Sequence, residues 1–207
     1  MLVLFVHGMG RTPLSGWPMM RRLRRGGLGT TTFGYTTIFE SFDSITLRLV
    51  SRLSEVAATG PYVVVGHSLG GVLLRAALDS LPKDVTRPRH VFLLGSPIQP
   101  SRLARRLKDN LLFRVIAGDC GQLLGSSSRM NAIGALSEPA TGVAGVRGLS
   151  NRRGPFGEEP NDGIVSVGEV SASWLSNQIW LPVIHTLLPA SRLVAEVILH
   201  ELGPEAG

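Results

Sequence analysis

The sequence predicts an α/β protein in which a mostly parallel sheet of about six strands carries helices on both faces. Short runs of β-branched and other apolar residues alternate along the chain with segments of helical period. The first strand candidate is apolar throughout, as strands covered on both faces are. The chain of 207 residues has no repeat or long linker and is long enough to form one core. We therefore expect a single domain over residues 1–207.

The first half of the chain alternates strand and helix. Its first strand, "LVLFVHG", ends in a glycine-bearing turn, and a later helix is ended by Pro82. Spacings of four, four and three mark one apolar helix face, formed by Ile45, Leu49, Leu53 and Val56. The expected strands lie at 2–8, 30–35 and 62–66, and the expected helices at 17–25, 41–58 and 69–81.

The second half has a looser pattern. Strands are expected in "HVFLLGSP", "GVAGVRG" and "QIWLPV", at 90–97, 142–148 and 178–183, with a last helix at 190–202. Between residues 97 and 141, short amphipathic pieces such as "SRLARRLKDNLLFRV" lie among glycines. Binding loops of open α/β sheets gather at the carboxyl ends of the strands. Residues 97–141 are thus either ordinary core or a pocket-lining, lid-like excursion.

The formal charge of +6 comes almost wholly from arginine. Two basic clusters lie at 21–25 and 102–108, and neither has the interleaved aromatic residues that stack on nucleic-acid bases. We expect a solvated arginine surface and no nucleic-acid partner. The second cluster adjoins "NLLFRVI", so peripheral contact with an anionic membrane surface stays open.

Several features concern the location of the protein. Every apolar run is shorter than the ~18 residues that span a membrane. The stretch "MLVLFVHGMG" lacks a basic region and a cleavage site and is typical of a structural strand rather than of a signal peptide. The single Cys120 agrees with a reducing compartment. We expect a cytoplasmic protein without a transmembrane segment, and the sequence leaves its oligomeric state open.

The motif "GHSLGG" lies between the strand at 62–66 and the following helix. Gly66 and Gly70 flank Ser68 in the G-x-S-x-G arrangement of a nucleophile elbow, and His67 shapes the same turn. A side chain at either glycine would collide with neighbouring backbone in such a strained corner. Ser68 is thus expected to be a nucleophile, and the alternative is a small residue in a tight turn.

Together with "FVHGMG", "PNDGIV" and "VIHT", this motif resembles the α/β-hydrolase family, in particular its small lidless bacterial esterases and lipases. The resemblance spans nearly the whole chain. Because Met1 lies almost on the strand that carries the His-Gly motif, the resemblance implies a minimal version of the fold. It also implies no large cap domain.

The family's order of serine, acid and histidine points to the partners of Ser68. Among five histidines, His185 has the position of the base, on a loop after a strand, although an ordinary loop histidine is the alternative. The acid is expected to be Asp162 in "PNDGIV", whose alternative role is a plain turn residue. Asp119 is the competing acid if "FRVIAG" forms a strand.

A tetrahedral intermediate also needs N–H donors for its oxyanion. The resemblance assigns these donors to the backbone of Leu69, after the nucleophile, and of Met9 in "VHGMG", for which a glycine turn is the alternative.

These residues predict a serine hydrolase that cleaves a small-molecule or lipid carboxylic ester through an acyl-enzyme. No metal or organic cofactor is expected, since no His or Cys pair has ligand spacing. The alternatives are a thioesterase, an amidase or an acyltransferase with the same triad, or a non-catalytic binding scaffold.

Overall fold

The computed structural model describes residues 1–148 and 154–203. Its strands form one six-stranded sheet in the order β2-β1-β3-β4-β5-β6, and all five neighbouring pairs are parallel. This arrangement confirms the predicted fold class. The strands are β1 (Leu2–Val6), β2 (Gly29–Phe33), β3 (Tyr62–His67), β4 (Val91–Leu94), β5 (Ala140–Gly145) and β6 (Asn177–Leu181).

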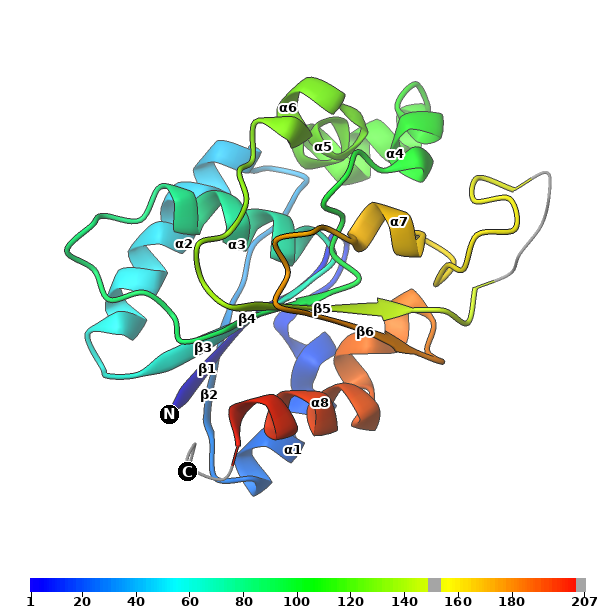
Figure 1. Ribbon diagram of the computed structural model, residues 1–207. Coiled ribbons are helices and arrows are strands. Elements are labelled where there is room, and N and C mark those ends of the chain that lie inside the picture. The colour runs from blue at the N-terminus through cyan, green and yellow to red at the C-terminus, as the bar shows by residue number, and fades with distance from the viewer. Residues whose placement is uncertain (149–153, 204–207) are drawn as a thin grey trace.

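Helices cover both faces of the sheet. Figure 1 shows α1 (Trp17–Arg25) and α8 (Arg192–Leu202) below it, and α2 (Phe42–Ala57) and α3 (Leu69–Asp79) above it. Successive side chains of β3 point into opposite cores, with Val63 and Val65 packed towards α1 and α8 and Val64 packed towards α2 and α3. Burial of both faces explains why the central strands are apolar throughout.

The segment between β4 and β5 folds into helices above the edge of the sheet where the strands end (Figure 1). They are α4 (Arg102–Leu107), α5 (Leu111–Gly125) and α6 (Ser127–Asn131). The 15-residue α5 is longer than the short pieces that the sequence predicts, and it bends at Gly118, where φ is 54°. "FRVIAG" lies within α5, whose first turn is capped by the Asn110 side chain, so the alternative of a strand there is wrong.

The remaining differences from the predicted elements are small. The strand predicted at 178–183 ends at Leu181, because Pro182 has no N–H to donate to a neighbouring strand. β5 begins two residues before its predicted start, at Ala140. The sequence did not predict three short elements, η1 (Pro13–Gly16), α7 (Val167–Val170) and η2 (His185–Ala190). Across the part of the chain that the structure describes, no helix has the length and hydrophobicity to cross a membrane.

The turn from β3 into α3 brings backbone segments into close approach at two glycines. A Cβ at Gly66 would lie 2.5 Å from the Cα of Gly71, and a Cβ at Gly70 would overlap the carbonyl oxygens of Val6 and His7. The start of α3 therefore lies directly against the end of β1 only because both positions lack a side chain.

We predict that Gly70→Ala lowers the free energy of unfolding by roughly 3 kcal/mol, because the new methyl group meets backbone rather than a movable side chain. Gly134→Ala is the matched control, since a Cβ there meets nothing within 4 Å. It should change the free energy by less than about 1 kcal/mol. Urea unfolding measures both values, and equal effects would contradict this account of the turn.

Candidate active site

Ser68 occupies the corner between β3 and α3. Its backbone has φ 53° and ψ −123°, and it is the only non-glycine residue with positive φ in the described chain. Such a conformation is strained and persists only where the surroundings fix it. The N–H of Ser68 donates to the carbonyl of Leu94 at the end of β4, at 2.9 Å. Ser68 is half-buried and forms the N-cap of α3, so the positive end of that helix faces the corner.

His185 and Asp162 form a buried pair at the same edge of the sheet. The Nδ1–H of His185 donates to Oδ2 of Asp162 at 2.7 Å. The other carboxylate oxygen accepts from the backbone N–H groups of Ile164 and Val165, both at 2.9 Å. The N–H of His185 also donates to the carbonyl of Asp162 at 3.0 Å. These contacts fix the imidazole with Nε2 free to accept a proton.

The end of β4 brings this pair next to the serine corner. Gly95 follows Leu94, whose carbonyl binds Ser68. A Cβ on Gly95 would lie 3.0 Å from Nδ1 of His185 and 3.1 Å from Oδ2 of Asp162. The structure therefore gathers the three residues that the sequence predicts as a triad around one strand end.

His67 links the corner to the histidine loop. Its ring lies 4.9 Å from that of His185, and its Nε2 lies 3.0 Å from the backbone carbonyl oxygen of His185. A carbonyl only accepts, so Nε2 carries the hydrogen and donates it. Burial lowers the pKa of His67 well below its usual value, and within the described residues its Nδ1 has no hydrogen-bond partner. From its sequence motif, His67 is expected only to shape the turn.

The glycine loop after β1 lies on the other side of the serine. A Cβ on Gly8 would lie 3.1 Å from the Cβ of Ser68, so the start of this loop, just before Met9, adjoins the corner. His7 supports this loop through Nδ1–H, which donates to the Gly8 carbonyl at 2.9 Å. Tyr35 stacks on His7 at 4.3 Å and donates its hydroxyl hydrogen to the His7 carbonyl. Tyr35 has no signal in the sequence, because only the pairing of β1 with β2 brings it to His7.

Asp119, the competing acid, has a different role. Its carboxylate accepts from the guanidinium of Arg129 at 2.6 and 3.1 Å and from the N–H of Phe42 at 2.9 Å. The Arg129 guanidinium lowers the pKa of Asp119. The structure thus places Asp119 in a link between α5, α6 and the start of α2, and the acid beside His185 is Asp162.

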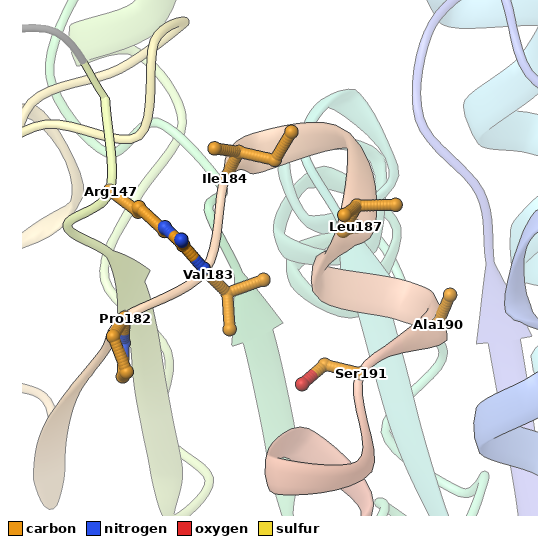
Figure 2. A pocket seen from close by; sticks show the side chains of 7 residues that line it. All are labelled: Arg147, Pro182, Val183, Ile184, Leu187, Ala190 and Ser191. Carbon is orange, nitrogen blue, oxygen red and sulfur yellow. The ribbon is translucent and has the colours of Figure 1, made fainter.

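Cavities lie at and near the candidate site. One of about 260 Å³ is lined by His185, Asp162 and Ile164, among others. It shares Arg147 and Ile184 with a second of about 500 Å³, in which Figure 2 shows the Arg147 side chain reaching towards Val183. A third, of about 220 Å³, lies beyond the glycine loop. Over residues 1–148 and 154–203, no cluster of three or more His, Cys, Asp or Glu side chains could hold a metal ion.

Several solved structures that are similar over the whole chain are named as thioesterases or esterases. The thioesterase RedJ from the prodiginine biosynthetic pathway of Streptomyces coelicolor is 18% identical, with a TM-score of 0.65 over 97% of this chain and 88% of its own. A metagenomic carboxyl esterase is 18% identical, with a TM-score of 0.71 over all of this chain and 72% of its own. The Vlm2 thioesterase domain is 20% identical, with a TM-score of 0.63 over all of this chain and 92% of its own.

No protein-family model matches the chain, and no curated protein matches it in sequence. The similarity in structure, together with the sheet order and the serine corner, shows that the chain has the α/β-hydrolase fold. This result confirms the family resemblance of its motifs at the level of the fold.

The buried histidines predict an acid-sensitive fold. Burial lowers the pKa values of His7, His67 and His90 in the folded protein. Below about pH 6.5 the unfolded chain therefore binds protons that the folded chain excludes, and the free energy of unfolding decreases as the pH is lowered. One such group contributes a slope of at most about 1.4 kcal/mol per pH unit.

We expect His67→Gln to reduce this slope, since glutamine does not titrate and keeps a donor for the His185 carbonyl. Urea unfolding at pH 7.5 and pH 5.0 measures the difference. If the unchanged protein and the His67→Gln variant lost the same free energy of unfolding between the two pH values, His67 would protonate equally in the folded and unfolded states.

Proposed function

We propose that the protein is a serine hydrolase that cleaves carboxylic esters through an acyl-enzyme intermediate. Ser68 is the nucleophile, His185 the general base and Asp162 the acid that orients it. The observation that carries the proposal is the 2.7 Å hydrogen bond from His185 Nδ1 to Asp162, beside a serine held at φ 53°. A strained serine and a buried histidine–carboxylate pair at one sheet edge match the needs of acyl transfer.

The reaction follows from these positions. Ser68 Oγ attacks the acyl carbon while Nε2 of His185 takes its proton, and Asp162 stabilises the resulting imidazolium. The oxyanion of the tetrahedral intermediate is met by the N–H groups of Met9 and Leu69. Leu69 is the first residue of α3, so the helix dipole adds to this stabilisation. His185 then protonates the leaving alcohol, and in a second round activates the water that releases the acid.

Thioesters are the second candidate substrates. Two of the three similar structures described above are named thioesterases, and the third is named a carboxyl esterase. The same triad serves both reactions, which differ in whether an alcohol or a thiol leaves the tetrahedral intermediate. Turnover of an oxygen ester and a thioester with the same acyl group ranks the two by their kcat/KM values.

The nucleophile assignment predicts that Ser68→Ala lowers kcat for a soluble p-nitrophenyl ester by roughly 10⁶-fold. Ser51→Ala, at an exposed serine of α2, is the control and should keep full activity. Substantial turnover by the Ser68 variant would remove this serine from the reaction.

The acid assignment predicts that Asp162→Asn lowers kcat by about 10⁴-fold, because an amide neither stabilises the imidazolium nor favours the required tautomer. Asp119→Asn replaces a carboxylate outside the site with an amide of the same shape. It should lower kcat by less than about tenfold. The same ester assay compares the two, with thermal melting to check that both variants fold. A larger loss of kcat in the Asp119 variant would reverse the assignment.

A further inference from the structure

The first half of α5 is apolar on both its inner and its outer side. Leu111, Leu112, Val115 and Ile116 are exposed at 75, 68, 65 and 45% of their surface. They form two adjacent i,i+4 rows, so they share one outward face. Phe113 and Ala117 face the protein. Apart from Arg114, this segment is apolar on every side, and a helix of that kind is normally buried or in contact with lipid.

Two further apolar residues extend this face. Ile38 and Phe39, in the loop between β2 and α2, are 51 and 87% exposed. The loop is attached to α5, because the Thr37 hydroxyl donates to the Ile116 carbonyl at 2.8 Å. We call this surface the apolar patch; its residues are Ile38, Phe39, Leu111, Leu112, Val115 and Ile116.

Exposed cations lie next to the α5 part of the apolar patch, while Glu40, beside Phe39, is paired with Arg48. Four cations are exposed here: Arg105 and Arg106 on α4, Lys108 directly after α4, and Arg114 on α5. None of the four forms an ion pair with a described residue. By contrast, Arg102 on α4 pairs with Glu159 and Glu169. Across residues 105–114 the only carboxylate is that of Asp109. An apolar surface with unpaired cations around it complements an anionic lipid surface.

The apolar patch also borders the candidate site. Ile38 and Ile116 line the cavity of about 220 Å³, together with His7 and Gly10 of the glycine loop. That loop lies beside Ser68, as the close approach of Gly8 shows. A lipid surface on the apolar patch would therefore meet a cavity next to the glycine loop that adjoins Ser68.

We propose that the apolar patch docks on an anionic membrane surface and that the ester is drawn from this lipid phase. Docking on the membrane does not depend on which reaction the protein catalyses. The statement that the ester comes from the lipid phase rests on the proposed function. The partner is a lipid surface because the four cations are separate, exposed side chains beside an exposed apolar helix face.

The docking test uses the Ser68→Ala protein, so that hydrolysis plays no part. Sedimentation with phosphatidylcholine vesicles containing about 30% phosphatidylglycerol should carry the protein down, and neutral phosphatidylcholine vesicles should do so far less. Adding Leu112→Ser should weaken binding about tenfold through the loss of buried apolar surface. Adding Arg106→Glu should weaken binding only to the anionic vesicles.

Leu193→Ser is the control, because this leucine is 39% exposed on α8, across the sheet from the apolar patch. It should bind like its parent. Equal binding to neutral and anionic vesicles, or an equal loss in the control, would overturn the proposal. So would a change in oligomeric mass on Leu112→Ser without vesicle binding, which would make the apolar patch a contact between two copies.

The source of the ester is tested with Leu112→Ser in the otherwise unchanged protein. It should lose turnover of an ester embedded in anionic vesicles and keep turnover of a soluble p-nitrophenyl ester. Equal loss on both substrates would overturn the lipid source while leaving docking intact. Vesicle binding without turnover of any ester would instead reject the proposed function.

Discussion

The corner at Ser68 constrains the rest of the site. With φ at 53°, the chain reverses from β3 into α3 within a single residue, and α3 then starts against the carbonyl oxygens of Val6 and His7. This packing requires glycine at position 70, and it fixes the first N–H of α3 beside the loop after β1. One backbone conformation thus positions the Ser68 hydroxyl, the start of α3 with its helix dipole, and the glycine loop together.

The hydrogen bonds around this corner explain how His185 keeps its place. His185 is held from its ring by Asp162 and from its backbone by His67, the residue before the serine. A movement of the histidine loop therefore has to break a buried contact with the corner itself. Burial lowers the pKa of His67 and so favours its uncharged form, which spares the neighbouring His185 ring a positive charge.

The sequence predicted much of this arrangement because the motifs are local. The motif "GHSLGG" and its flanking residues predict a strand, a turn and a helix together. The family's order of serine, acid and histidine then points to Asp162 and His185 as candidates. Contacts between distant segments could not be predicted from local patterns. His67 binds a residue 118 positions away, and Tyr35 contacts His7 only because the strands before them pair. The sequence predicted only short helical pieces in the region of α5, because Gly118 bends the helix without ending it. Periodicity also could not predict which side of α5 faces outward, because apolar residues occupy most of its circumference.

The most direct test of the central claim is a crystal structure of the protein after reaction with a fluorophosphonate. The account predicts a phosphorus bonded to Ser68 Oγ, with one phosphoryl oxygen about 3 Å from the backbone nitrogens of both Met9 and Leu69. It also predicts His185 still bound to Asp162. A phosphorus on another residue, or on Ser68 with its oxygen turned away from both nitrogens, would contradict the site described here.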